Sequence, residues 1–255
     1  MSSLRIHRNT PESPADHVGE PREPVAGHGC RVCLVRHLAM CSALPAEQAS
    51  ALEELAGDLQ LRAGELLARE GQPRRYVFTV QTGALRRTRT LADGRRLVAG
   101  FLMPGDYIGF SGSDHYRHTI EAITDSTLCA VPQQGMRTLC QTHPGLEHEL
   151  LRRACIELDT TRDKLMALAR MTPPERLAGF LQDMAQRRAR QGLDPVVIAL
   201  PMTRTDIADS LGLTIETVSR CFTKLRGEGL IATPDPHTVR LLDRRRLDLL
   251  AAAGG

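Results

Sequence analysis

Three cysteines lie close together near the start of the chain. Cys30, Cys33 and Cys41 are separated first by two residues and then by seven. Thiolates at this spacing can bind one soft metal centre, either a zinc ion or an iron–sulfur cluster. A fourth ligand must come from elsewhere, and the spacing alone does not select it. The open candidates are the other cysteines and two nearby histidines: Cys129, Cys140, Cys155, Cys221, His28 and His37.

The compartment follows from the same cysteines and from the N-terminal residues. Residues 1–27 are polar and rich in proline, with no apolar segment of the kind that a signal peptide needs. No run approaches the roughly 18 apolar residues of a membrane span. We therefore expect a cytoplasmic protein without a membrane partner. Structural disulfides are rare in the cytoplasm, so the seven cysteines are better read as ligands or buried thiols.

A second group of residues with recognisable chemistry lies in the segment 202–226. Thr203 and Asp206 have the spacing of a capping pair that opens a helix. Gly212 permits a tight turn, and Thr214 can cap a second helix. Apolar residues on both helices supply the faces that pack together. These are Ile207, Ala208, Leu211, Val218, Phe222 and Leu225. The pattern is typical of a helix-turn-helix.

The outer face of the second helix carries side chains that read DNA. Glu216, Ser219 and Arg220 lie near its N-terminal half, where a recognition helix meets base edges. Arginine can donate to guanine, glutamate can accept from cytosine, and serine can bond to a base or a phosphate. Thr217 and Lys224 are expected to contact phosphates. The sequence therefore predicts binding to double-stranded DNA.

Composition and charge agree with a duplex reader and exclude other classes. The net charge is +3, and residues 170–255 carry 13 basic against 10 acidic side chains while residues 1–169 are balanced. Aromatic residues make up only 3% of the chain, which excludes a stacking surface for single strands. The sequence contains no phosphate-binding glycine loop, zinc-protease motif or G-x-S-x-G motif. We therefore do not expect an enzyme.

The elements that must position these residues predict an α+β chain in four parts. Short apolar stretches with turn signals between residues 59 and 132 are typical of a small antiparallel β-roll. A helical pattern follows from residue 135, interrupted near Pro144. The expected parts are a disordered tail over 1–27, the cysteine segment and β-roll over 28–134, a long helix over 135–171 and a winged helix-turn-helix domain over 172–255.

The long helix predicts a dimer. Its apolar residues recur at steps of three, four and seven, which is the pattern of a coiled-coil seam. They are Leu146, Leu150, Leu151, Ala154, Leu158, Leu165 and Leu168. The alternative is a single helix packed on its own roll. We favour a homodimer, because DNA readers are commonly two-fold dimers.

At these residues the sequence resembles the FNR branch of the cAMP receptor protein superfamily, the fumarate-and-nitrate-reduction regulators. The resemblance runs from about residue 30 to residue 242. It rests on the cysteine cluster and on the segments 105–109, 126–132 and 215–220. It implies a [4Fe–4S] cluster bound by Cys30, Cys33, Cys41 and Cys129. The remaining cysteines, Cys140, Cys155 and Cys221, are then expected to be buried thiols.

The resemblance also implies a mechanism. Without oxygen the cluster favours dimerisation, and the Glu216, Ser219 and Arg220 faces enter successive major grooves of a palindrome resembling TTGAT-N4-ATCAA. Oxygen degrades the cluster and the DNA is released. Such a regulator activates or represses anaerobic or microaerobic genes and contacts RNA polymerase through surface loops. The spacing of Cys33 and Cys41 is wider than in enteric members and resembles that in photosynthetic and nitrogen-fixing bacteria.

Two other kinds of regulator with the same fold are alternatives. A cyclic-nucleotide receptor of this superfamily needs a glutamate and an arginine, but Phe110 and Tyr116 stand in those places. We therefore do not expect a cyclic nucleotide as ligand. A regulator stabilised by structural zinc is the other alternative, and it would be indifferent to air.

Overall fold

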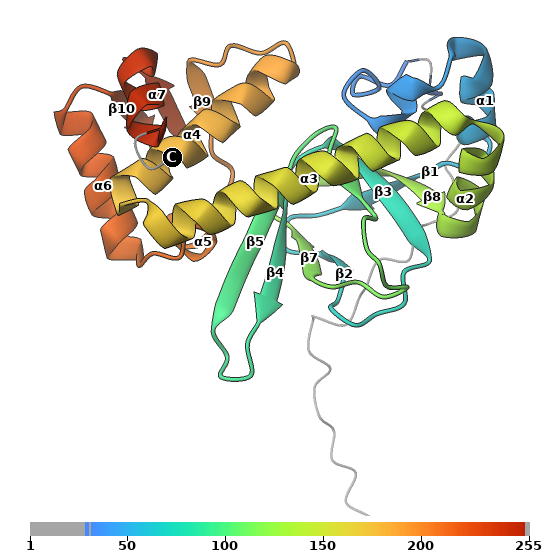
Figure 1. Ribbon diagram of the computed structural model, residues 1–255, viewed down its shortest axis with the longest axis horizontal. Helices are drawn as coiled ribbons and strands as arrows, with labels where there is room; N and C mark the ends of the chain where they lie inside the picture. The colour runs from blue at the N-terminus through green and yellow to red at the C-terminus, as the bar shows by residue number, and fades with distance from the viewer. Residues whose placement is uncertain (1–28, 31, 253–255) are drawn as a thin grey trace, which may run out of the picture.

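The structure of the protein is a computed structural model that describes residues 29–30 and 32–252. The expected disordered tail, 1–27, and the candidate ligand His28 lie outside the described residues. Figure 1 shows a β-roll, a long helix that crosses it and a C-terminal helical domain with a small sheet. The predicted α+β architecture is confirmed.

The cysteine segment folds into short turns that lead into the roll. Two 3₁₀ turns, η1 (Met40–Ala43) and η2 (Ala46–Gln48), precede helix α1 (Ala49–Glu53). Their apolar side chains pack on one end of the roll and on the helices that follow it. The buried members of this cluster include Met40, Leu44, Leu52, Val77, Val131 and Leu139.

The roll consists of two four-stranded antiparallel sheets. Its strands are β1 (Gly57–Leu61), β2 (Leu66–Ala68), β3 (Tyr76–Thr82), β4 (Leu85–Thr90), β5 (Arg96–Leu102), β6 (Tyr107–Ile108), β7 (Thr119–Ala122) and β8 (Ser126–Pro132). The strand orders are β1-β8-β3-β6 and β2-β7-β4-β5. Alternate side chains of both sheets form a shared interior that includes Leu61, Val80, Leu85, Ile120 and Leu128.

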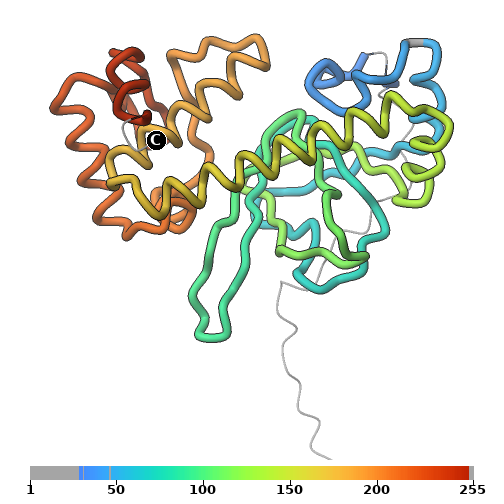
Figure 2. The backbone as a smooth tube through the Cα atoms, in the orientation of Figure 1, coloured from blue at the N-terminus to red at the C-terminus, as the bar shows by residue number. Residues whose placement is uncertain are grey.

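Two helices follow the roll. Helix α2 (Gln133–Thr142) and helix α3 (Pro144–Arg170) are separated at His143, because proline cannot continue a helix but fits its first turn. With 27 residues, α3 is about 40 Å long. Figure 2 shows that it runs from the end of the roll near the cysteine segment to the C-terminal domain.

The apolar stripe of α3 divides into two faces. Leu146 is fully buried against the cysteine segment and α2, and Leu150 packs on the same cluster. In contrast, Leu151, Leu158 and Leu165 are 63%, 50% and 68% exposed. The first two leucines therefore hold α3 to its own roll, and the other three form an uncovered face.

The C-terminal domain surrounds helix α4. Its elements are α4 (Pro173–Arg190), β9 (Val197–Ala199), α5 (Arg204–Leu211), α6 (Ile215–Gly227), β10 (Ile231–Asp235), β11 (Thr238–Leu241) and α7 (Arg244–Ala252). The three strands pair in the order β10-β11-β9, so the expected hairpin is present. Helix α7 lies beyond the last element that the sequence predicts, and it packs on α4 through Leu247 and Ala251.

The roll and the C-terminal domain share one apolar core. Val98 and Phe101 of β5 belong to the cluster formed by α4, α5 and α6. The ring of Phe101 meets that of Phe180 edge-on, with centroids 6.0 Å apart. Arg187 of α4 adds an ion pair at 2.6 Å to Asp106, in the turn after β5. Among the described residues, no helix has both the length and the apolar surface needed to cross a bilayer.

Candidate metal centre and nucleic-acid interface

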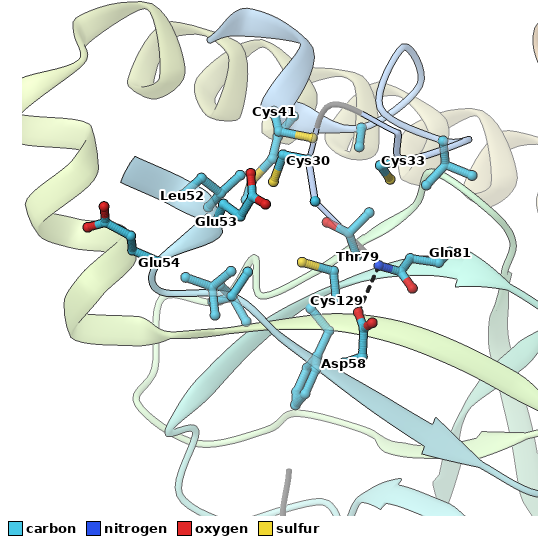
Figure 3. Close-up of a pocket in the computed structure, with 18 residues that line it drawn as sticks. Cys30, Cys33, Cys41, Leu52, Glu53, Glu54, Asp58, Thr79, Gln81 and Cys129 are labelled. Atoms are coloured by element: carbon cyan, nitrogen blue, oxygen red, sulfur yellow. Dashed lines mark hydrogen bonds between the residues drawn. The ribbon is translucent and has the colours of Figure 1, made fainter. Parts of the chain in front are cut away.

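Four cysteines border one cavity between the cysteine segment and the roll. Cys30, Cys33, Cys41 and Cys129 line a space of about 390 Å³ (Figure 3). The first three come from the turns before α1, and Cys129 comes from β8. The remaining wall is largely apolar and includes Val35, Ala39, Met40, Leu52, Val77 and Val131.

The thiols of Cys30, Cys41 and Cys129 are poorly solvated, and neighbouring cysteines affect the pKa of each. Burial, together with the neighbouring thiols of Cys30 and Cys33, raises the pKa of Cys41 to about 11. Burial also raises the pKa of Cys129 far above its ordinary value, helped by Cys30 and Cys41. Thiolates here would repel one another in a poorly solvated site, and a bound cation is what compensates such charges.

The four thiols are the donor set that a metal centre at this cavity would use. Within the described part of the chain, no three His, Cys, Asp or Glu side chains lie close enough together to hold one metal ion. A zinc site needs ligands that converge on one point, with Zn–S distances of about 2.3 Å. Four thiols around a cavity have the composition of the Cys₄ donor set of a [4Fe–4S] cluster, which some structural zinc sites share.

Acidic side chains also reach this cavity, which the sequence did not reveal. Glu53 and Asp58 line it, and Asp58 lies directly opposite Cys129 in the β1–β8 pair. Gln81 donates a hydrogen bond of 3.1 Å to Asp58. Only the strand register brings Asp58 to Cys129, because 70 residues separate them in the chain.

The loop between Cys33 and Cys41 is tied to the long helix. Arg153 of α3 donates to the Leu38 carbonyl at 2.6 Å and is paired with Glu149 at 2.6 Å. Gly105 of the roll packs closely against Leu38 of the same loop. Its φ of +92° favours glycine, and a Cβ atom at this position would clash with the Leu38 side chain. A change in the conformation of this loop would therefore directly alter a hydrogen bond to α3.

The other candidate ligands lie elsewhere. Cys140, Cys155, Cys221 and His37 do not line the cavity. The expectation that the three spare cysteines are buried holds for Cys221, whereas Cys140 is half-buried. It is wrong for Cys155, which is exposed because no described residue covers that face of α3.

The helix-turn-helix forms through local capping contacts. Thr203 accepts a hydrogen bond from the Asp206 amide at 3.1 Å, and the Asp206 carboxylate accepts one from the Thr203 amide at 3.1 Å. Gly212 ends α5 in the left-handed region, with φ +63°. Thr214 caps α6 by accepting from the Thr217 amide at 3.2 Å. The predicted caps and turn are confirmed.

Helix α6 presents the predicted reading residues outward. Glu216, Ser219, Arg220 and Lys224 are exposed, and Thr217 is half-buried at the N-terminal turn. The opposite side of the helix is buried through Val218, Phe222 and Leu225. The arrangement leaves one polar face free to enter a DNA groove.

Arg204 is a half-buried basic residue of α5 that lies next to α6. Its guanidinium lies over the Phe222 ring, 3.4 Å from the centroid, and its buried Nη1 has no hydrogen-bond partner among the described residues. Arg204 is the first residue of α5, directly after the Thr203 cap, and this position in the sequence could have pointed to it.

Phe110 and Tyr116, the two residues compared with those of cyclic-nucleotide receptors, make contacts within the roll. The Phe110 ring packs on Tyr107 with centroids 4.7 Å apart, and the Tyr116 hydroxyl donates to the Tyr76 carbonyl at 3.1 Å. Arg74 donates to backbone carbonyls of the loop after β6, including those of residues 109 and 113.

Comparison with known proteins agrees with both halves of this description. A cyclic nucleotide-binding domain model matches residues 58–143, and a Crp-like helix-turn-helix domain model matches residues 175–250. The transcriptional activator protein FnrL of Cereibacter sphaeroides is 33% identical over 88% of this chain and 92% of its own. The nitrogen fixation regulation protein FixK of Bradyrhizobium diazoefficiens is 37% identical over 89% and 95%.

A solved structure shares the whole architecture. FixK2 of Bradyrhizobium japonicum superposes with a TM-score of 0.72 at 34% sequence identity, covering 76% of this chain and 96% of FixK2. These relatives are transcription regulators and not enzymes. With the β-roll, the long helix and the capped helix-turn-helix in place, the chain belongs to the Crp/Fnr family of DNA-binding transcription regulators.

Proposed function

We propose that the protein is an oxygen-responsive regulator in which Cys30, Cys33, Cys41 and Cys129 bind a [4Fe–4S] cluster. The observation that carries the proposal is that these four cysteines line one cavity. Similarity to the transcriptional activator FnrL and to the nitrogen fixation regulation protein FixK supports a role in controlling transcription. We propose that the protein acts in the cytoplasm and activates or represses anaerobic or microaerobic genes. Surface loops would contact RNA polymerase during activation.

A bound [4Fe–4S] cluster would supply reactivity toward oxygen and a covalent tie among the four thiolates. The chain's own residues carry the effect onward. Cys33 and Cys41 flank the loop whose Leu38 carbonyl accepts from Arg153. Binding both ends of this loop to a cluster would therefore fix the hydrogen bond between the loop and α3. Loss of the cluster would leave the loop and this hydrogen bond free to change.

The uncovered face of α3 is the proposed homodimer seam. Leu151, Cys155, Leu158, Arg162 and Leu165 follow one another at steps of four, three, four and three residues, which is a heptad pattern. Pairing two copies along this seam would bring two α6 helices to one side for a palindrome resembling TTGAT-N4-ATCAA. Moving a two-state equilibrium at this interface from 1:99 to 99:1 would need roughly 5.5 kcal/mol of differential stabilisation.

The first experiment is anaerobic purification followed by measurement of iron, sulfide and visible absorbance before and after exposure to air. We expect about four irons and four sulfides per chain, as in a Cys₄-ligated [4Fe–4S] protein. We also expect the brown colour and palindrome binding to be lost together in air. A colourless zinc protein whose DNA binding ignores air would contradict the cluster and leave the DNA reader standing.

Arg220→Ala is expected to weaken binding to the cognate palindrome by about 1–3 kcal/mol and to relax preference at one guanine. The exposed Arg220 guanidinium at the N-terminal half of α6 can form two hydrogen bonds with a guanine edge. Binding to duplexes with every base at each position checks this. Arg137→Ala, which removes an exposed arginine from α2, is the matched control for loss of charge. Equal loss on all sequences would mean that Arg220 only touches phosphate.

A further inference from the structure

A buried ion-pair cluster joins the β4–β5 hairpin to the first helix of the reading motif. Asp206, in the first turn of α5, has a side chain only 1% exposed. Arg86 of β4 donates to both of its carboxylate oxygens at 3.0 Å, and Arg96 of β5 donates to one of them at 2.8 Å. We call these three residues the Asp206 cluster.

Both arginines are themselves held in place. The second edge of the Arg86 guanidinium donates to Glu121 of β7, its directly paired strand neighbour, at 2.7 and 3.3 Å. Arg96 also donates to Asp209, one turn further along α5, at 2.9 and 3.1 Å. Fork-shaped contacts of this kind fix direction as well as distance. These hydrogen bonds therefore fix the orientation of α5 relative to the β4–β5 hairpin.

The Asp206 carboxylate belongs to the reading motif as well. It accepts hydrogen bonds from the Thr203 amide and hydroxyl at 3.1 and 2.8 Å. Burial alone would raise its pKa, but these bonds and the two guanidinium charges hold the pKa below its ordinary value. The carboxylate is therefore charged. It accepts hydrogen bonds both from the reading motif and from the two arginines of the roll.

The contact leaves the DNA-reading face open. Helix α5 packs on α6 through Ile207 and Ala208, so fixing α5 also fixes α6. Glu216, Ser219 and Arg220 remain exposed in this arrangement. A contact that prevented DNA binding would cover that face, and this one does not.

We propose that Arg86 and Arg96 are positioning residues that set the spacing of the DNA half-sites, by fixing the orientation of each reading domain through Asp206. The inference rests on the proposed dimer that binds a palindrome. In a two-fold dimer the separation of the two α6 helices depends on how each reading domain sits relative to the α3 seam. Chain connectivity between the domains runs only through the α3–α4 junction, so contacts away from it must fix the angle.

The test compares full-length wild type with the Arg86→Gln, Arg96→Gln double variant, both loaded with cluster anaerobically. Fluorescent duplexes carry one half-site, the palindrome, or the palindrome with two base pairs added to or removed from its spacer. Wild type should lose at least about tenfold in affinity when the spacer changes, because the second half-site is then out of reach. The double variant should lose less than about threefold, with half-site binding within about twofold of wild type.

Arg95→Gln is the matched control. Arg95 adjoins Arg96 but is 77% exposed and pairs with Asp93 in the hairpin tip. It should keep the spacer preference of wild type. If the double variant also loses half-site binding, the milder Asp209→Asn decides, since it removes one partner of Arg96 from a partly exposed site. Partial relaxation of spacer preference there supports the proposal, and an unchanged preference overturns it.

The two proposals fail differently. A double variant as strict about spacing as wild type would overturn the positioning role of Arg86 and Arg96 while leaving the regulator as proposed. Wild type that binds a half-site as tightly as the palindrome would instead overturn the dimeric reading of DNA, and the spacing inference with it.

Discussion

Cys129→Ser is expected to yield a protein that folds but retains no stable iron–sulfur cluster and no measurable preference for the palindrome. Cys129 lies on β8 at the wall of the cavity opposite the three N-proximal cysteines. Serine is a poor ligand for iron in this setting, and the Cys₄ donor set would be incomplete. Iron and sulfide content after anaerobic reconstitution should fall from about four to below about one per chain.

Cys140→Ser is the matched control for this substitution. Cys140 lies in α2, and it does not line the cavity. Cluster content and palindrome binding should stay at wild-type levels. If the two variants exchange these results, the fourth ligand is Cys140 and the assignment made here is wrong. Circular dichroism on both variants checks that any loss is not one of folding.

Leu158→Asp is expected to raise the dimer dissociation constant at least about 100-fold and to remove palindrome binding with it. Leu158 is 50% exposed in the protomer and lies at the middle of the proposed seam. A carboxylate there would meet its own copy across a two-fold axis in an apolar contact, which costs both desolvation and repulsion. Sedimentation velocity on the cluster-loaded protein measures the effect.

Leu249→Asp provides the comparison for the seam variant. Leu249 is 64% exposed on α7 and lies outside α3. It should leave the dimer and the thermal stability unchanged, since both leucines are exposed before substitution. A Leu158→Asp protein that remains dimeric would contradict the seam on α3. A monomeric Leu249→Asp protein would place the interface on the C-terminal domain instead.

The reading motif was predictable in detail because its contacts are local. Thr203 and Asp206 cap one another across three residues, and Thr214 reaches the Thr217 amide across the same distance. The helix break at Pro144 follows equally from a single residue. Signals of this range can be read directly from the chain.

Contacts between distant residues were not predictable in the same way. Arg153 meets the carbonyl of Leu38, and Asp206 meets Arg86, across 115 and 120 residues. No pattern along the chain predicts either pair. The apolar stripe of α3 likewise gave no indication that Leu146 packs inward while Leu158 stays uncovered. Helix α7 was missed because its first turn is three arginines, and its stability comes from packing on α4.

The shared core of the two domains limits how freely natural or engineered regulators of this kind can be recombined. Val98 and Phe101 lie in the roll by sequence but fill space among the helices of the reading domain. A chimera joined at the α3–α4 junction would pair each reading domain with a foreign hairpin, leaving a void or a clash where these side chains pack. New DNA specificities are therefore more easily acquired by changing the surface of α6 in place than by exchanging the reading domain as a module.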